Sequence, residues 1–304
     1  MSNLCTEIGL PVSTLETFVC CLASANLALY DEWKATDLLW VIVCLLEAAL
    51  TEYIEKTAGK TGFEYAHRFA KRHRALGIGV LGWHDLLQSK MIPVESMEAK
   101  HLNNEIWRLM KDKTYEASSI LASIFGEPEV CKGYGRRHAT LLAVAPTTSS
   151  SCILGQVSMG IEPHASNYYV KPLAKLRFTF KNKNLKKVLK AHNKDTPETW
   201  KSIMKTGGSV QHLKFLSDHE KAVFKTWDEI SPMELVIQAS QRQKFIDQAQ
   251  SFNLLIHPET PAKQVSQLLI EGWRLGIKSF YYQRGANPSQ KLARSILECA
   301  NCES

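Results

Sequence analysis

The sequence predicts an α/β protein, because helical and strand-like apolar patterns alternate along its 304 residues. The clearest helix covers residues 98–125, where apolar side chains recur at helical spacing before Gly126 and Pro128. Residues 140–145, TLLAVA, have the continuous apolar character of a buried strand. A chain of this length can bury the core of one or two domains.

A second helix and strand are expected near the C-terminal end. Thr260 is a suitable N-cap and Pro261 a suitable first-turn residue for a helix that Gly276 ends. Residues 277–282, IKSFYY, then have the composition of a strand.

The composition excludes disordered and disulfide-scaffold proteins, with 45% hydrophobic and 22% charged residues and a formal net charge of +7. Residues 1–11 are polar, so no signal peptide is expected. The longest uncharged apolar run, Leu38–Leu46, is far shorter than the ~20 residues of a membrane-spanning helix. We expect a cytoplasmic protein that does not bind membranes.

The positive charge is densest in one lysine cluster, which consists of Lys181, Lys183, Lys186, Lys187 and Lys190. Because no aromatic residues are interleaved with these lysines, the cluster is more typical of the solvated face of a helix than of a nucleic-acid site. No nucleic-acid partner is expected.

Two of the eight cysteines, Cys299 and Cys302, form a CxxC pair within six residues of the C-terminus. A zinc ribbon needs a second such pair, and none is present at that spacing, so no metal site is expected. A dithiol on a mobile tail can close to a disulfide and exchange with another disulfide. The alternative is two incidental cysteines in a frayed end.

Gly77, Gly79 and Gly82 form a GxGxxG pattern, which is common in dinucleotide-binding folds. Such a site needs a hydrophobic strand before the motif, whereas the preceding residues are basic and helical in character. The glycines are instead expected to allow close helix packing.

Two other segments carry groups suited to chemistry. Thr148, Ser149 and Ser150 follow the strand expected at 140–145, where hydroxyls and backbone N–H groups can hold phosphate oxygens; an ordinary polar turn explains them equally well. Asn3, Cys5 and Glu7 alternate in a segment that we expect to be extended, which would place an amide, a thiol and a carboxylate side by side. A solvated polar terminus is the alternative there.

In this order, the segments resemble the C-terminal part of the large subunit of class I, aerobic ribonucleotide reductases. The matching stretches are SNLCTEIGLP, VCCLASANLA, RALGIGVLG, GRRHATLLAVAPTTSSS, GIEP, QKFIDQAQSFN, IKSFYYQ and CANC. The resemblance implies the second half of a ten-stranded α/β barrel over residues 1–282, with a finger loop at its N-terminus and another chain completing it. It also implies a flexible redox arm over residues 283–304.

The resemblance implies a role for each residue of the finger loop. Cys5 would be the thiyl radical site that abstracts the ribose 3′ hydrogen, Glu7 the base on the 3′ hydroxyl, and Asn3 a hydrogen-bonding partner of the substrate. Cys20, six residues before Asn26, would be one member of the active-site pair that is oxidised to a disulfide.

Further roles follow from the same resemblance. Thr148, Ser149 and Ser150 would hold the substrate diphosphate. Tyr281 and Tyr282 would relay the radical from the small subunit. Cys299 and Cys302 would re-reduce the active-site disulfide and be reduced in turn by thioredoxin or glutaredoxin.

The expected activity is therefore the reduction of ribonucleoside diphosphates to deoxyribonucleoside diphosphates. No cofactor is expected on this chain, because the radical would come from a dimetal–tyrosyl small subunit. An N-terminal chain would complete the large subunit, as in the split subunits of some phages, and the location would then be the host cytoplasm. The alternatives are a non-catalytic assembly fragment and a cobalamin-dependent relative, which would not need the tyrosine pair.

Overall fold

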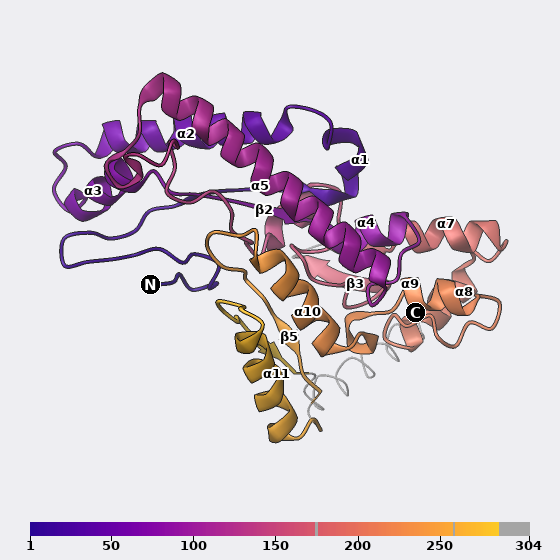
Figure 1. The fold of residues 1–304 in the computed structure, drawn as a ribbon. Coiled ribbons are helices and arrows are strands. Elements are labelled where there is room, and N and C mark those ends of the chain that lie inside the picture. Colours follow the sequence, from indigo (N-terminus) through magenta and orange to yellow (C-terminus); the bar gives the residue numbers. More distant parts are fainter. Residues whose placement is uncertain (174–175, 258, 286–304) are drawn as a thin grey trace.

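The computed structural model describes residues 1–173, 176–257 and 259–285 (Figure 1). The helices are α1 (Tyr30–Trp33), α2 (Leu38–Thr57), α3 (Glu64–His73), α4 (Trp83–Ser89), α5 (Met97–Phe125), α6 (Thr148–Ile153), α7 (Lys183–Ala191), α8 (Pro197–Lys205), α9 (Asp218–Val223), α10 (Pro232–Gln243) and α11 (Ala262–Arg274). The strands are β1 (Cys21–Asn26), β2 (Leu76–Leu81), β3 (Tyr168–Leu173), β4 (Leu176–Lys181), β5 (Leu254–Leu255) and β6 (Gln283–Arg284). Single 3-10 turns lie at Leu27–Leu29, Glu129–Cys131 and Trp227–Glu229.

The fold is organised by parallel segments that lie side by side in the order of the chain. We call this series of hydrogen-bonded segments the ladder. β1 pairs with β2 along its whole length, from Cys21↔Leu76 to Asn26↔Leu81. Beyond β2 the ladder continues through parallel bridges and a short strand pair, namely Ile78↔Leu142, Val144↔Gln250 and Leu254↔Gln283. Parallel neighbours require a crossover between them, and the crossovers carry α2, α5, α10 and α11. This is the arrangement of part of an α/β barrel, as the resemblance implies.

The main core lies between this ladder and its crossover helices. In succession, α2 packs on β1, α5 on α2, α10 on α5, and α11 on α10. The fully buried side chains of this core come from every layer, and include Val43, Ile78, Trp107, Leu142 and Val236. The ladder is therefore held to its helices by one continuous apolar cluster.

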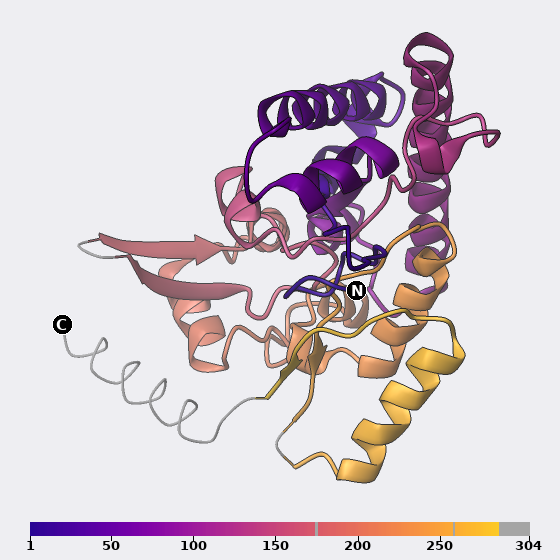
Figure 2. The same ribbon diagram turned by 90° about the vertical axis from the view of Figure 1, so that its left-hand side faces the viewer.

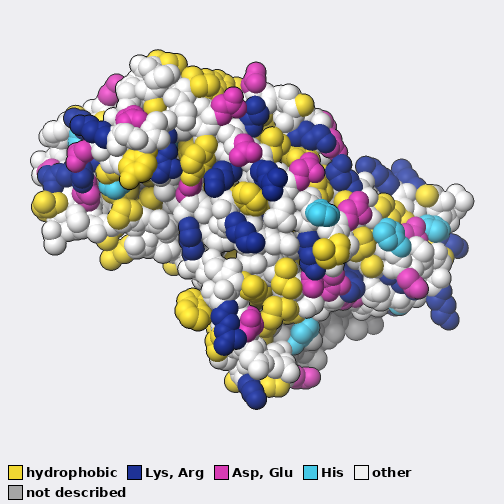
Figure 3. All heavy atoms as spheres, in the orientation of Figure 1, with side chains coloured by type: hydrophobic (Ala, Val, Ile, Leu, Met, Phe, Trp, Pro, Cys, Tyr) yellow, Lys and Arg dark blue, Asp and Glu magenta, His cyan; other side chains and the backbone are white. Residues whose placement is uncertain are grey.

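A second, smaller core lies outside the ladder. The antiparallel β3–β4 hairpin projects from the body of the molecule, and α7, α8 and α9 follow it (Figure 2). Its buried cluster is separate from the main core and includes Leu185, Trp200, Ile203 and Phe224. On α7, Lys186, Lys187 and Lys190 are exposed opposite buried Leu185 and Leu189, so the predicted solvated helix face is confirmed for these lysines. Lys181 is the exception, because it ends strand β4. On the face shown in Figure 3, Lys and Arg side chains are interspersed with Asp and Glu.

Three element predictions need correction at their boundaries. Residues 140–145 contribute only bridges to the ladder, because their hydrogen bonds to the two neighbours are interrupted rather than continuous. The strand predicted at 277–282 is assigned at Gln283–Arg284, although Tyr281 and Tyr282 already hydrogen-bond to Phe252 and Leu254. Pro261, not Thr260, is the N-cap of α11. The predicted helix at 98–125 is confirmed as α5.

The expected role of Gly77 and Gly79 is wrong, because both lie inside β2 rather than between helices. A Cβ atom on Gly77 would lie 2.5 Å from Leu22 Cδ2, and one on Gly79 would lie 2.4 Å from the Ala143 carbonyl oxygen. Both glycines therefore allow neighbouring segments of the ladder to approach closely.

In the described ranges, no helix is long and apolar enough to cross a membrane.

A buried ion cluster fixes α2 to the residues that flank β2 and the next ladder segment. The Glu47 carboxylate accepts hydrogen bonds from Arg74 Nε at 3.0 Å, Arg137 Nε at 2.9 Å and His138 Nε2 at 3.1 Å. Burial opposes ionisation, but these donors outweigh it and lower the pKa of Glu47 to about 2. The pKa of His138 is lowered by burial, so its ring is neutral at pH 7.

We predict that Glu47→Gln lowers the free energy of unfolding by about 3 kcal/mol at pH 7, because it leaves two guanidinium groups without their carboxylate. The folded pKa of Glu47 lies below its unfolded value, so the stabilisation is present above the unfolded value of 4.5 and disappears as the pH falls toward 2. Urea unfolding at a series of pH values measures both effects.

Glu52→Gln on the same helix is the matched control, since Glu52 pairs with Lys56 at the exposed surface, where solvent screens the ion pair and little stability is lost with it. Equal destabilisation by the two substitutions would contradict the prediction.

Candidate active site

Residues 3–9, which we call the finger loop, form a turn and not the extended segment predicted from the sequence. The Thr6 N–H donates to the Asn3 carbonyl at 3.2 Å, and Thr6 has a left-handed φ of 64°. Asn3 Oδ1 accepts the Ile8 N–H at 3.1 Å, so this amide side chain holds the loop in shape. Side chains 3, 5 and 7 are therefore arranged by a turn rather than by strand alternation.

Two neighbouring segments hold the finger loop to the ladder. The Ala249 N–H donates to the Glu7 carbonyl at 2.9 Å, and the Gly9 N–H donates to Gln248 Oε1 at 3.2 Å. Ser279 Oγ donates to the Thr6 carbonyl at 2.8 Å. The loop is thus fixed against the segment around residue 249 and the segment that leads to β6.

This placement brings Cys5 to the tyrosine pair. Cys5 Sγ lies 3.7 Å from the hydroxyl oxygen of Tyr281. The rings of Tyr281 and Tyr282 are 3.9 Å apart between centroids, with an angle of 34° between their planes. Hydrogen bonds with Tyr282 and with Cys5 raise the pKa of Tyr281 above its usual range, so the Tyr281 hydroxyl keeps its proton. Tyr282 is 52% exposed, so the row of groups runs from the thiol to the surface.

Glu7 is a buried carboxylate beside this row, with 2% of its surface exposed. In the part of the chain that the structure describes, its Oε2 has no hydrogen-bond partner. A buried carboxylate oxygen without a donor is costly, and a hydroxyl group placed next to it would remove that cost.

Cys20 lies directly before β1 and is a free thiol. Its sulfur accepts a hydrogen bond from Gln248 Nε2 at 3.3 Å. Burial raises the pKa of Cys20 to about 12, and the Gln248 donor acts in the opposite direction. The resting form of Cys20 at pH 7 is therefore the neutral thiol.

Residues 147–151, which we call the hydroxyl-rich loop, follow the ladder segment 140–145. Thr148, Ser149 and Ser150 are exposed on the first turn of α6. Thr147, which sequence reasoning did not select, has a left-handed φ of 54° and accepts the Gly160 N–H on its Oγ1 at 2.8 Å. Asn26, at the end of β1, donates to the Leu154 carbonyl at 3.0 Å and fixes the other end of α6.

The structure does not describe the residues of the predicted C-terminal dithiol. Cys299 and Cys302 lie outside the described residues. Within the described ranges, no three His, Cys, Asp or Glu side chains gather into a cluster that could hold a metal ion.

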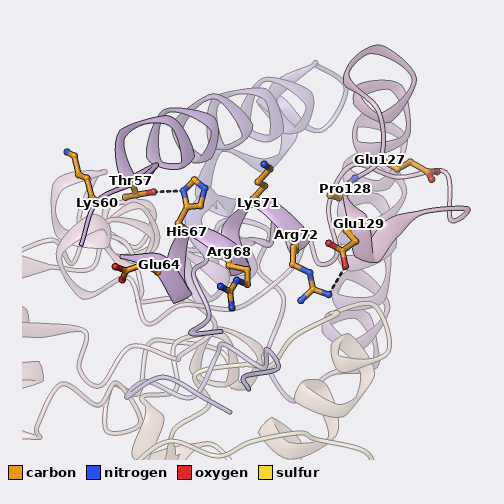
Figure 4. Close-up of a pocket in the computed structure, with 11 residues that line it drawn as sticks. Thr57, Lys60, Glu64, His67, Arg68, Lys71, Arg72, Glu127, Pro128 and Glu129 are labelled. Carbon is orange, nitrogen blue, oxygen red and sulfur yellow. Dashed lines mark hydrogen bonds and ion pairs between the residues drawn. The ribbon is translucent and has the colours of Figure 1, made fainter. Parts of the chain in front are cut away.

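A surface hollow of about 720 Å³ lies elsewhere, between α3 and residues 127–129. Its lysine and arginine side chains point in different directions, with Lys60 and Lys71 on one side and Arg68 on the other (Figure 4). Arg72 is already paired with Glu16 and Glu129. The hollow therefore has no group of side chains that converges on a ligand.

A parallel ladder covered by crossover helices, with a thiol-bearing loop held against it, defines an α/β-barrel protein with a candidate redox site. Comparison with known families makes this assignment specific. The family model described as "Ribonucleotide reductase, barrel domain" matches residues 1–130 and 127–283. The chain belongs to this family.

Individual relatives agree with the family match. The chain is 40% identical over 298 residues to the ribonucleoside-diphosphate reductase large subunit of Invertebrate iridescent virus 6, covering 96% of this chain and 30% of the relative. For the large subunit of Invertebrate iridescent virus 3 the identity is 38%, covering 93% and 45%. The solved class Id alpha subunit of Actinobacillus ureae superimposes with a TM-score of 0.89 at 51% identity, covering 94% and 53%. The chain thus spans about half or less of the length of these relatives.

We predict that Asn3→Ala frees the Ile8 amide, because it removes the acceptor of that N–H. Amide hydrogen exchange at Ile8 should become about tenfold faster, the effect of one lost hydrogen bond. Asn3→Asp keeps an acceptor oxygen and should leave the exchange rate near that of the original chain. Equal rates for Asn3→Ala and the original chain would show that Asn3 does not hold the turn.

Proposed function

We propose that this chain is the catalytic part of a ribonucleoside-diphosphate reductase large subunit and that it forms deoxyribonucleotides by thiyl-radical chemistry. The observation that carries the proposal is the row formed by Cys5, Tyr281 and Tyr282, with the thiol 3.7 Å from the first hydroxyl. This row distinguishes the proposal from a purely structural fragment, which has no use for a thiol at the end of a tyrosine pair.

The row supports a hydrogen-atom transfer. A radical generated on a dimetal–tyrosyl small subunit reaches Tyr282 at the surface and passes to Tyr281. The Tyr281 oxygen then takes the hydrogen atom of the Cys5 thiol, so that an S–H bond breaks, an O–H bond forms and the unpaired electron remains on sulfur. A tyrosine pair serves long-range transfer, and a cobalamin-dependent enzyme, which makes its radical locally, does not need it.

The remaining groups act on the nucleotide. Cys5 takes the 3′ hydrogen of the ribose while Glu7, whose Oε2 lacks a donor within the described ranges, takes the proton of the 3′ hydroxyl. The 2′ hydroxyl leaves as water, and a thiol pair that includes Cys20 supplies two electrons and two protons and becomes a disulfide. Cys5 then returns the hydrogen atom to C3′, which leaves the unpaired electron on its sulfur again, and Glu7 returns its proton to the 3′ oxygen. Thr148, Ser149 and Ser150 hold the diphosphate. Asn3 fixes the loop, and its side-chain N–H₂ is available for the substrate.

Another chain is proposed to supply the other half of the barrel and the second cysteine of the pair. In the described ranges, β1 pairs only with β2 and β6 only with β5, so both ends of the ladder have an unpaired edge. On α2, which packs on β1, Val41 and Leu45 are 56% and 64% exposed. Unpaired edges and apolar side chains are features of a surface that another segment covers.

The C-terminal cysteine pair is proposed to return the active-site thiols to their reduced state after each turnover. Cys299 and Cys302 reduce the disulfide at Cys20 by thiol–disulfide exchange and are reduced by thioredoxin or glutaredoxin.

We predict that Cys5→Ser abolishes product formation without affecting assembly, because an O–H bond does not yield its hydrogen atom to a tyrosyl radical. The assay combines this chain with its small subunit and a complementing chain, namely the unmatched remainder of the Actinobacillus ureae alpha subunit. Cys44→Ser, a half-buried cysteine on α2 outside the site, is the control. Normal activity of the Cys5→Ser complex would refute the radical assignment.

We also predict that the double substitution Cys299→Ser and Cys302→Ser permits the first turnover but stops further turnovers driven by thioredoxin. The active-site thiols can act once without the arm and then remain oxidised. Rapid-quench measurement of deoxynucleotide per complex separates the two phases. Continued turnover with the protein reductant would exclude the arm from the cycle.

Finally, the chain and the small subunit should form no product until the complementing chain is added. Size-exclusion chromatography is expected to show the two large-subunit chains eluting together. Product formation in the absence of the complementing chain would contradict the proposed division of the barrel.

A further inference from the structure

Gln248 is a fully buried side chain that touches both the finger loop and the redox cysteine. Its Oε1 accepts the Gly9 N–H at 3.2 Å, and its Nε2 donates to the Leu76 carbonyl at 2.9 Å and to Cys20 Sγ at 3.3 Å. These partners lie 239, 172 and 228 residues away in sequence. No other described side chain hydrogen-bonds to both of these parts of the site.

The orientation of the Gln248 amide is determined by its two backbone partners. The Gly9 N–H can only donate and the Leu76 carbonyl can only accept, so the oxygen must face Gly9 and the nitrogen must face Leu76. The nitrogen carries two hydrogens, one for the Leu76 carbonyl and one for the sulfur. Cys20 is therefore the acceptor in this contact, and its sulfur receives a hydrogen bond whether or not it carries a proton.

We propose that Gln248 is a positioning residue for the redox cysteine: it holds Cys20 beside the finger loop and stabilises the thiolate form of Cys20 by donating a hydrogen bond to its sulfur. The proposal deepens the function proposed above and rests on it for the catalytic step, but the sulfur contact itself can be tested in this chain alone.

The thiolate matters when the active-site disulfide is reduced. An incoming thiolate from a dithiol reductant attacks the partner sulfur and forms a new S–S bond with it. The old S–S bond breaks, and its electron pair stays on Cys20, which leaves as a thiolate and then takes up a proton from solvent. A leaving thiolate is favoured by any donor aimed at its sulfur. Cys20 is otherwise surrounded by groups that disfavour negative charge, since burial and the nearby Cys21 and Glu7 all raise its pKa.

The test is the alkylation rate of Cys20 in the full-length chain over a series of alkaline pH values. Cys21→Ser serves as the background, and cleavage after glutamate releases peptide 17–32, on which Cys20 is then the only thiol. Iodoacetamide labelling of this peptide is followed by mass spectrometry. Gln248→Met removes the donor and should slow labelling at each pH by about tenfold, the effect of one hydrogen bond to a charged group. A residue that only supported packing would have the opposite effect, because a looser site exposes the thiol and speeds labelling.

Gln250→Met is the matched control. Gln250 is also fully buried, two residues along the same segment, but it bonds to Arg242, Gln243 and the Ala239 carbonyl and does not touch a cysteine. Its substitution should leave the labelling rate of Cys20 unchanged. Gln248→Glu is the second test variant; it keeps an acceptor for Gly9 and puts a carboxylate beside the sulfur, so labelling should slow at least as much.

The outcomes separate this inference from the function on which it rests. Unchanged or faster labelling of Cys20 in Gln248→Met would overturn the role of Gln248. If Gln248→Met does not fold, the same result in Gln248→Glu decides the question. In the reconstituted reductase, Gln248→Met should keep the first turnover and slow the later ones. If the reconstituted original chain formed no product, the proposed function would fail while the labelling result still decided the sulfur contact.

Discussion

Residues 248–251 hydrogen-bond to residues 142–144 and, at Ala249, to the Glu7 carbonyl of the finger loop. The Val144 N–H donates to the Ala249 carbonyl at 3.1 Å, while the Ala249 N–H is used by Glu7 at 2.9 Å. One residue thus links the ladder to the loop that bears Cys5. The register of this segment also determines where Gln248 meets Cys20, so a slip of one residue would turn that side chain to the other face. The candidate site depends on this segment more than on any single side chain.

Buried charge supports the loops at both sides of the ladder. Glu47 gathers Arg74, Arg137 and His138 beneath α2. At the other side, Asp85 accepts the Ser158 N–H at 2.6 Å and pairs with His164 at 2.9 Å. Burial opposes ionisation of Asp85, yet the contacts with His164 and Ser158 lower its pKa. The segment after α6 is therefore anchored to α4, which fixes the far end of the hydroxyl-rich loop.

The sequence predicted those helices that are marked by their own apolar periodicity and by the residues at their ends. The helix at 97–125 shows the periodicity and the terminal Gly126 of its type. The shape of the finger loop was not predictable in this way, because the left-handed Thr6 is held by contacts to Asn3 and to distant Ser279. Gln248 gave no signal either, since a glutamine in a polar stretch has no distinctive pattern and its partners lie more than 170 residues away. The roles expected of Cys5, Glu7 and the tyrosine pair came only from the resemblance, which rests on several motifs that occur together in one order.

The second core has an evolutionary consequence. The buried side chains of the cluster around Leu185, Trp200 and Phe224 come from α7–α9 and the loops that follow α8 and α9. Its junction with the barrel includes the polar contact from Asn182 Nδ2 to Gln88 Oε1 at 2.8 Å and the side chain of Met91. Substitutions inside this cluster can be compensated by its own members, without changes in the ladder or its helices. We therefore expect this unit to accept sequence changes, insertions and deletions that the barrel does not.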